Sequence, residues 1–400
     1  MTKRFLQIHT LTGYSAALLN RDDIGRAKRM TLGGYDRLRI SSQCLKRHWR
    51  SATSEWSIAD LAEGKSLRSR KIFSDVIAKD LVQEGMNPKD ITQVLKPVKD
   101  MVLTGKLNKS STSSKKKPQD DLVQEDGKFE TLRTDQVIVL GQPEISFLRN
   151  LALELHRNTQ DKGTDIQEEV KSYFEGKEGK NTRENLKSLV RGAGVDAAIF
   201  GRMVTSDVLA RTDAAIHVAH SFTVHAEESE PDYFSALDDL ILESGELGSG
   251  HINSTEITSG LFYSYVVIDV PLLIQNLTKD VELAEEVVKR IIHLIATITP
   301  GAKLGATAPY ACAEFMMIES GNTQPRTIAN AFASPVSKQD ARSGAVQELN
   351  RYLERYDNMY GCEDTRKFAS MIEVPSTNHT GDKVPLGLLA QWAASTVAGN

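Results

Sequence analysis

Residues 20–50 read NRDDIGRAKRMTLGGYDRLRISSQCLKRHWR and concentrate basic side chains. They include nine Lys or Arg residues and three acidic residues, whereas the whole chain of 400 residues has a formal net charge of −4. The first 50 residues hold eleven basic and three acidic residues, so the remainder of the chain is strongly acidic. A dense basic patch on an otherwise acidic protein predicts a binding surface for a polyanion.

The pattern within this stretch predicts a loop and a short strand. Gly33 and Gly34 mark a turn, or a place where the backbone must come close to another segment. Basic and apolar residues alternate over residues 38–40, which is typical of the end of a half-buried strand.

A helix is expected over residues 43–50, with Ser41 or Ser42 as its N-cap. Leu45 and Trp49 lie four residues apart in the sequence and are expected on the buried face of this helix.

Lys46 and Arg50 are also four residues apart, on another face of the same helix. Like charges at this spacing cost roughly 0.2–0.5 kcal/mol in an isolated helix, so an anion bound between them would explain the pair. A helix N-terminus with hydroxyl groups and free N–H groups is itself an anion site. The alternative is a basic helix face that is simply exposed to water.

Several segments resemble the signature of the CasC family, the repeated backbone subunit of type I-E CRISPR Cascade, an RNA-guided surveillance complex. They are NRDD, GG, RLRISSQCLKR and Arg50 in the basic stretch, and GRMVTSD (201–207), AHSFTVH (219–225) and QPRTIANAFASPV (324–336) further on. The usual motif has Ser where this chain has Cys44. The resemblance spans nearly the whole chain and is weakest in the helical insertion described next.

The distribution of helix-like and strand-like segments divides the chain into a core with two insertions. The core is expected at residues 1–53, which include the basic loop and helix, at 193–225 and at 260–400, where the C-terminal helices lie. Residues 54–192 read as a helical insertion, in which the low-complexity segment 106–121 is expected to be a flexible loop. Residues 226–259 form a second, acidic insertion, expected to be a surface hairpin or loop.

The expected elements indicate an α+β protein with a ferredoxin-like core. Core strands are expected at 3–11, 196–204, 213–225, 260–270 and 311–318, and core helices at 279–299, 337–356 and 388–397. In the insertion, helices are expected at 56–61, 67–84, 88–104, 143–156, 167–174 and 182–191. The resemblance implies that the core is the family's palm, a modified RNA-recognition-motif (RRM) sheet, with the two insertions as fingers and thumb.

The resemblance also implies that guide RNA lies against the basic loop and helix. The residues expected to contact its phosphates are Arg21, Arg39, Ser41, Gln43, Lys46 and Arg50. Met203 is expected to wedge beside a displaced nucleotide, and Phe234, Ser235 and Ile252 are thumb candidates. Lys303 matches a family position near the RNA, although Leu304-Gly305 follows it where Gln or Asn is usual.

The function implied is that of a non-catalytic subunit that polymerises head to tail along crRNA. It would hold the phosphates without regard to sequence and present the bases for pairing with target DNA. The partners implied are crRNA, target DNA through that pairing, adjacent copies of the chain and other Cascade subunits. No cofactor is expected.

A metal-dependent ribonuclease is the alternative function. Relatives of this backbone in other CRISPR classes cut target RNA with a loop aspartate, and Asp22 and Asp23 lie beside the basic cluster. The simpler interpretation is that these two carboxylates pair with Arg21 or Arg26. A metabolic enzyme has little support, because the sequence lacks GxGxxG, P-loop and GxSxG motifs.

Three histidines, His217, His220 and His225, have the spacing HxxHxxxxH, which suggests a zinc site. In a continuous strand, however, His217 and His225 would point to one face and His220 to the other, so no metal site is expected.

The cysteine content and the apolar runs indicate where the protein works. There are three cysteines and no CxxC pair, which fits a reducing compartment and argues against a disulfide framework. No signal-peptide pattern begins the chain, and no apolar run approaches ~18 residues. The protein is therefore expected to be cytoplasmic, with no membrane partner.

Overall fold

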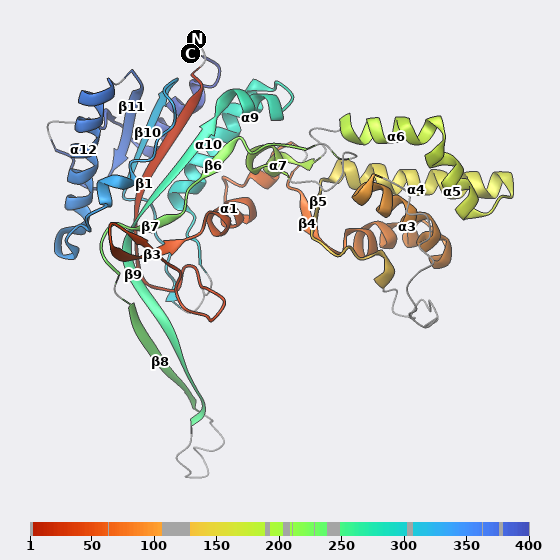
Figure 1. Ribbon diagram of the computed structural model, residues 1–400, viewed down its shortest axis with the longest axis horizontal. Coiled ribbons are helices and arrows are strands. Elements are labelled where there is room, and N and C mark those ends of the chain that lie inside the picture. The colour runs from red at the N-terminus through yellow and green to blue at the C-terminus, as the bar shows by residue number, and fades with distance from the viewer. Residues whose placement is uncertain are drawn as a thin grey trace. The chain divides into compact units, whose positions relative to one another are not determined.

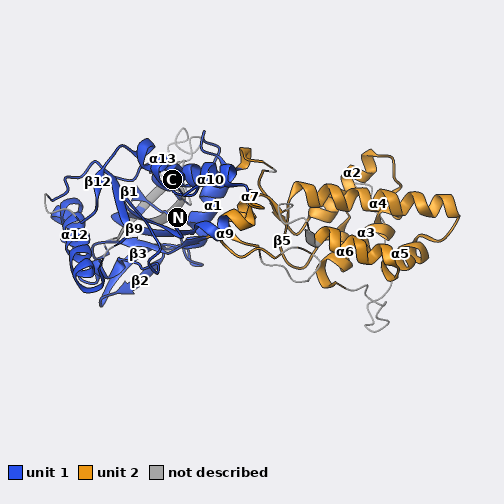
Figure 2. Ribbon diagram, turned by 90° about the horizontal axis from the view of Figure 1, so that it is seen from above, with its two compact units in different colours: residues 1–58, 216–273, 280–400 blue, residues 59–215, 274–279 orange. Residues whose placement is uncertain are grey.

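The computed structural model describes residues 3–62, 64–105, 129–188, 193–202, 209, 211–227, 229–237, 249–301, 307–361, 363–375 and 379–399. The predicted flexible loop at 106–121 lies outside these described residues. The chain divides into two compact units (Figure 2): unit 1 is Met1–Ile58, Ile216–Leu273 and Asp280–Asn400, and unit 2 is Ala59–Ala215 and Ile274–Lys279. Unit 2 thus extends beyond residue 192, where the helical insertion was expected to end.

Unit 1 is built on one sheet with helices on both of its faces. Its strands are β1 (Phe5–Ala17), β2 (Arg29–Leu32), β3 (Tyr35–Ile40), β6 (Ile216–Val218), β7 (Ser221–Thr223), β8 (Ser229–Leu237), β9 (Ser249–Asp269), β10 (Phe315–Gly321), β11 (Thr365–Ser370) and β12 (Asp382–Lys383). Its helices are α1 (Ser42–Ser51), α10 (Val281–Thr297), α12 (Ala341–Tyr360) and α13 (Leu386–Ser395), and α9 (Val270–Asn276) begins in unit 1.

The strands follow the order β12-β11-β10-β1-β9-β7-β3-β2, and Figure 1 labels those from β11 to β3. β1 is central and pairs antiparallel with β10 on one side and with β9 on the other. β6 and β8 also pair with β9, beside that path. The α+β class is therefore confirmed, and the predicted strands at 3–11 and 260–270 correspond to β1 and the second half of β9.

The alternation of side chains along β9 fills two apolar layers. Leu261, Tyr263 and Tyr265 belong to one core, together with residues of α12. Val266 and Ile268 are buried as well. Helices α10 and α13 pack together, and α13 contacts β10 and β11, so a second helical layer covers the other face. Both faces of the sheet are apolar for this reason.

Part of the second insertion forms a long hairpin. β8 pairs antiparallel with the first half of β9, from Ser229↔Thr258 to Leu237↔Ser249, while the second half of β9 pairs with β1. One continuous strand therefore belongs to both the sheet and the hairpin, which Figure 1 shows reaching past the end of β1.

Unit 2 is mainly helical. Its elements are β4 (Leu67–Ser69), a π-helix (Ile72–Ile77), α2 (Ala78–Gln83), α3 (Pro88–Thr104), β5 (Ile138–Leu140), α4 (Gln142–Lys162), α5 (Ile166–Glu175), α6 (Lys177–Ser188) and α7 (Val195–Phe200). The strands β4 and β5 form a small antiparallel sheet that was not expected. The predicted helix at 67–84 was therefore wrong over residues 67–69, and the helix at 56–61 is reduced to a 3-10 helix at Ile58–Asp60.

The predicted strand at 196–204 was wrong, because this segment begins with helix α7. Residues 195–199 are all buried. Apart from Asp196 these residues are apolar, and a short apolar run that is buried on all sides has no periodicity that separates strand from helix. Alanine, which occurs here twice in succession, favours a helix.

The predicted single strand at 213–225 is instead two short strands, β6 and β7, with Ala219 and His220 between them. Because the strand is interrupted, the alternation of faces does not decide where His220 points relative to His217 and His225. At the C-terminal side, β10 begins at Phe315 rather than at residue 311, and β11, β12 and α9 were not predicted. No described helix combines the length and apolar character needed to cross a bilayer.

Candidate nucleic-acid interface

Strands β2 and β3 form a hairpin whose turn is Gly33-Gly34. The pair Leu32↔Tyr35 closes the turn, and the two glycines have φ of +62° and +84°. A Cβ on Gly33 would lie 1.7 Å from the carbonyl oxygen of Ala333, whereas a Cβ on Gly34 would meet nothing within 4 Å. Both roles suggested by the sequence occur here, since the glycines form a turn and one of them lies against another backbone segment.

The loop before β2 is closed by its own backbone and by Asp22. The N–H of Lys28 donates to the carbonyl of Asn20 at 2.8 Å, and the N–H of Asp22 donates to the carbonyl of Arg26 at 2.8 Å. Oδ1 of Asp22 accepts the N–H groups of Ile24, at 3.1 Å, and Arg26, at 2.8 Å. The carboxylate of Asp22 therefore stabilises the turn through main-chain donors.

Arg29 links this loop to the base of the long hairpin formed by β8 and the first half of β9. Its Nε donates to Glu227 at 2.5 Å, its Nη2 donates to Glu256, and its Nη1 donates to the carbonyl of Ala27 at 3.0 Å. Glu256 also accepts the N–H of Ala27 at 2.6 Å. Because two carboxylates neutralise Arg29, this residue adds little to the positive potential of the surface.

Arg37 is also used internally, because its side chain is fully buried. Its Nη1 donates to the carbonyl of Thr223 at 3.0 Å and its Nη2 to the carbonyl of Phe332 at 2.8 Å. Arg37 therefore links β3 to β7 and to the 3-10 helix at Ala329–Phe332.

Arg39 is two residues after Arg37, on the same face of β3, but it is only half-buried. Its Nη1 lies 3.0 Å from Nδ1 of His220, and its Nε donates to the carbonyl of Arg29 at 3.3 Å. Among the described residues, no carboxylate pairs with Arg39. The pKa of His220 is lowered by burial and then by the charges of Arg39 and Lys28. These three residues form a cluster of basic groups.

Helix α1 begins where the sequence indicated. Oγ of Ser41 accepts the N–H of Cys44 at 3.3 Å, and the N–H of Ser41 donates to Oδ1 of Asn20 at 2.9 Å. Leu45 and Trp49 are buried, as the four-residue spacing predicted. Asn20 thus joins the basic loop to the start of the helix.

The outer side of α1 carries Lys46 and Arg50, both half-buried. Nδ1 of His48, on the same helix, lies 2.8 Å from the carbonyl of Cys44, and its Nε2 accepts the N–H of Gly301 at 3.3 Å. Gly301, which follows α10 in the chain, therefore contacts helix α1.

A second cluster of charged side chains surrounds the buried Glu319 in unit 1. Glu319 accepts two hydrogen bonds from Arg326, at 2.5 and 2.8 Å, and one from Arg366, at 2.5 Å. Arg366 donates in turn to both oxygens of Asp357, at 2.6 and 2.8 Å. His9 lies 3.4 Å from Glu319. The two acids and two arginines balance one another, which is the usual condition for buried charge.

Burial and hydrogen bonds shift the pKa values of two members of this cluster, Glu319 and His9. Burial alone would raise the pKa of Glu319, but hydrogen bonds from His9 and Arg326 bring it well below 4.5, its usual value. The pKa of His9 is lowered, mainly by burial, so its imidazole is neutral. The cluster therefore joins β1, β10, β11 and α12 as a structural element.

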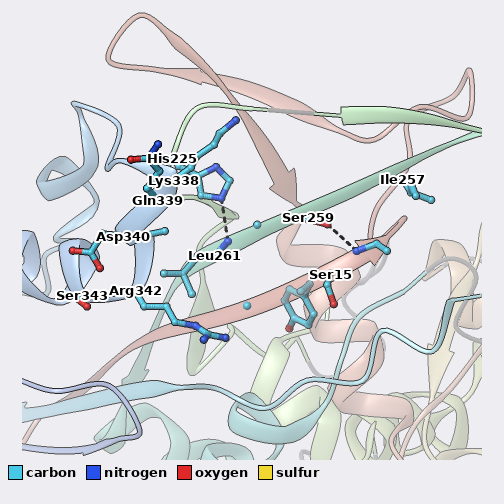
Figure 3. Close-up of a pocket in the computed structure, with 15 residues that line it drawn as sticks. Ser15, His225, Ile257, Ser259, Leu261, Lys338, Gln339, Asp340, Arg342 and Ser343 are labelled. Carbon is cyan, nitrogen blue, oxygen red and sulfur yellow. Dashed lines mark hydrogen bonds between the residues drawn. The ribbon is translucent and has the colours of Figure 1, made fainter.

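A cavity of about 920 Å³ lies near the root of the hairpin (Figure 3). Its walls are the end of β1, residues 257–261 of β9 and the start of α12. His225 lines it, but its Nε2 accepts the N–H of Leu261 at 3.2 Å and its Nδ1 lies 2.9 Å from the carbonyl of Ala226. His225 therefore supports β9 rather than activating a nucleophile. Within the described parts of the chain, no three His, Cys, Asp or Glu side chains are grouped to hold a metal ion.

Residues 6–388 match the family described as CT1975-like protein, a family of Cas proteins, and this match covers most of the chain. The chain belongs to the CT1975-like protein family. No curated protein gives a significant match to it.

Two solved structures resemble this CT1975-like chain along almost its whole length. One is a chain of a structure described as "CRISPR RNA-guided surveillance complex, pre-nicking", with 26% identity, a TM-score of 0.77 and coverage of 98% of this chain and 100% of that chain. The other is a chain of a "CRISPR RNA-guided surveillance complex", with 22% identity, a TM-score of 0.67 and coverage of 98% and 99%. The second similarity concerns the fold alone.

The predicted site residues of the CT1975-like chain fall into two groups. The basic loop, β3 and α1 carry Arg21, Arg39, Ser41, Gln43, Lys46 and Arg50, and hydrogen bonds through Asn20 tie loop and helix together. Phe234, Ser235 and Ile252 lie on the hairpin strands, where Ser235 pairs with Ile252 and Phe234 with Asn253, but their side chains lie outside the described structure. Met203 and Lys303 also lie outside the described residues.

Two members of the basic cluster were missed as binding candidates. Lys28 lies in the basic stretch but is not among the predicted contacts, and the spacing of His220 suggests only a metal ligand. The alternation of residues over 38–40 pointed to Arg39, but the pairing of β3 with β7 could not be read from the sequence. That pairing brings His220 to Arg39.

Proposed function

We propose that this chain is the backbone subunit of a type I-E CRISPR Cascade and binds crRNA through the basic loop, β3 and α1. It holds the phosphates without regard to sequence, and the bases remain available for pairing with target DNA. Unit 1 serves as an RRM-like palm, unit 2 as the fingers and the hairpin as the thumb. The chain is not a catalytic subunit.

The observation that carries this proposal is the way the basic stretch divides its charges. The side chains of Arg29 and Arg37 are engaged in hydrogen bonds within the protein. In contrast, Arg21 is exposed, and Arg39 has no carboxylate partner among the described residues. Two carboxylates thus engage Arg29, and main-chain carbonyls engage Arg37. The cations that remain on one edge of the sheet therefore suit an external polyanion.

The helix start adds neutral donors to these cations. Ser41 caps α1 with its oxygen but keeps a hydroxyl hydrogen, and the side chain of Gln43 is exposed in the first turn. Lys46 and Arg50 lie about one and two turns further along the same helix. Such a mixture of hydroxyl, amide and cationic donors is typical of contacts with a sugar–phosphate chain.

The remaining contacts are proposed from the family resemblance. Met203 would wedge beside a displaced nucleotide, and Lys303 would contact the RNA. Phe234, Ser235 and Ile252 would lie on RNA held by an adjacent copy, where stacking on an aromatic side chain is worth roughly 1–3 kcal/mol per base. Other Cascade subunits would bind elsewhere on the chain.

The salt dependence of RNA binding by the full chain tests the proposal. If about five phosphates are neutralised, affinity for single-stranded RNA should fall roughly a hundredfold between 50 and 200 mM salt. Arg39→Met should lower the slope of log K against log salt by about 0.7, the value for one lost phosphate contact. The control Arg351→Met, in an exposed pair on α12, should leave the slope unchanged.

Two results would overturn the proposal. One is an affinity that does not change with salt. The other is unchanged RNA retention after charge reversal at Lys46 and Arg50 in a chain that still folds.

The ribonuclease alternative has a distinct test. Asp22 is engaged by main-chain donors in the loop, which supports a structural role for it. Incubation of bound RNA with Mg²⁺ should leave it intact. Cleavage that Asp23→Ala abolishes would assign a catalytic function instead.

A further inference from the structure

We propose that His220 is a further ligand of the RNA backbone and holds the guanidinium of Arg39 until a phosphate replaces it. The inference rests on the proposed function, because it assigns a new residue to the same surface. His220 directly precedes β7, and β7 pairs with β3 through Arg39↔Phe222 and Ile40↔Ser221. The sheet register therefore places the imidazole beside Arg39.

The hydrogen bond between these side chains fixes the tautomer of His220. A guanidinium can only donate, so Nδ1 of His220, 3.0 Å from Nη1 of Arg39, must be the acceptor. The proton of the neutral imidazole is then on Nε2. His220 is exposed, and its neutral form keeps an N–H donor that can serve a bound phosphate.

The surroundings of His220 are positive. The charged groups that act on it are Arg39 on β3 and Lys28 in the loop before β2, and within the described residues no carboxylate pairs with either cation. Partial burial of the ring lowers the pKa of His220 below 6.5, and these two positive charges lower it further. The imidazole is therefore neutral in the free chain near neutral pH, as an acceptor for Arg39 must be.

A bound phosphate would oppose the effect of these positive charges on the pKa of His220. Negative charge beside an imidazole favours its protonated form and raises its pKa. Arg39 can then donate to the phosphate instead of to Nδ1, and a protonated His220 can donate from both ring nitrogens. RNA binding would thus take up a proton at His220, so affinity should rise as pH falls, by at most about tenfold per pH unit.

Three variants of the full chain separate the two roles of His220. His220→Leu removes both the acceptor and the donor. His220→Gln keeps an amide that can accept from Arg39 and donate to phosphate, but it cannot take up a proton. His217→Gln changes another exposed histidine, three residues earlier on β6, and is the matched control.

The measurement is fluorescence anisotropy of a labelled single-stranded RNA, titrated with each variant at about pH 8 and about pH 6. At the higher pH, His220→Leu should bind roughly three- to tenfold more weakly than the wild type, and His220→Gln within about twofold of it. At the lower pH, the wild type and His217→Gln should both tighten severalfold more than either His220 variant.

Two outcomes would overturn this inference while leaving the proposed function intact. One is wild-type affinity for His220→Leu at both pH values. The other is a pH response of His220→Gln equal to that of the wild type. A wild-type chain that binds no RNA at either pH would instead refute the proposed function itself.

Discussion

Gly33 and Gly34 adopt positive φ in the same two-residue turn, yet their surroundings differ. Gly33 lies against the carbonyl of Ala333, and Gly34 faces open space. The cost of a side chain at Gly34 is therefore that of the left-handed backbone alone, whereas at Gly33 it also includes separation of the hairpin from the segment around Ala333.

Substituting the two glycines should give different losses of stability. Gly34→Ala should destabilise the protein by about 1 kcal/mol, the cost of a left-handed alanine. Gly33→Ala should cost roughly 3 kcal/mol or more, since backbone must also move. All three tryptophans, Trp49, Trp56 and Trp392, belong to unit 1, so tryptophan fluorescence during urea denaturation reports on the right unit. Equal losses would contradict the close packing of Gly33.

At the scale of elements, the buried cluster around Glu319 joins three strands and a helix that are far apart in the sequence. Glu319 is on β10, His9 on β1, Arg366 on β11 and Asp357 on α12. Each charge is satisfied only while these elements remain together, because a buried charge without its partner is strongly destabilising. We therefore expect the cluster to set the acid sensitivity of unit 1.

Replacing Glu319 tests this expectation. Glu319→Gln leaves Arg326 and Arg366 without a shared carboxylate and should destabilise the protein by roughly 3 kcal/mol at neutral pH. The control Glu348→Gln, in an exposed pair with Arg351, should cost less than about 0.5 kcal/mol.

The pH dependence of the same variant gives a second measurement. The pKa of Glu319 is lowered in the folded chain, so its stabilisation is present above 4.5, the usual value for a glutamate, and is lost as pH falls below it. Urea midpoints measured from neutral to acidic pH should therefore fall less steeply for Glu319→Gln than for the wild type. Parallel curves would show that Glu319 does not set the acid response.

At the scale of the whole molecule, the chain keeps a basic surface within a protein of net charge −4. Arg29, Glu227 and Glu256 connect that surface to the root of the hairpin, so loop and hairpin are positioned together. A palm that binds RNA and a hairpin that reaches an adjacent copy would form a heterologous contact, which repeats into an open helical filament.

The proposed head-to-tail assembly predicts how many copies bind to one RNA. If each copy occupies a fixed number of nucleotides, the number of chains per RNA, measured by mass photometry, should rise in proportion to RNA length. Charge reversal at Lys46 and Arg50 should leave only free chains in the same measurement. A constant ratio of one chain per RNA would contradict head-to-tail assembly.

Several features of this protein depend only on neighbours along the chain and follow from the sequence alone. The Ser41 cap, the buried pair Leu45 and Trp49 and the glycine turn are local, because capping, helix periodicity and positive φ involve residues only a few positions apart. The same holds for the alternating strand that became the second half of β9. These features placed the basic patch on a loop, a strand and a helix.

The three-dimensional fold sets which basic residues remain available for an external ligand and which side chains surround them. Arg29, Arg37 and Arg39 belong to the same basic stretch but have different partners. Arg29 is neutralised by glutamates about 200 positions away, Arg37 is buried and donates to main-chain carbonyls, and Arg39 contacts His220. The strand predicted at 196–204, where the structure has helix α7, is wrong for the same reason. Burial on all sides removes the periodic signal. Charge compensation and burial act through space, and a sequence pattern reports only what lies close along the chain.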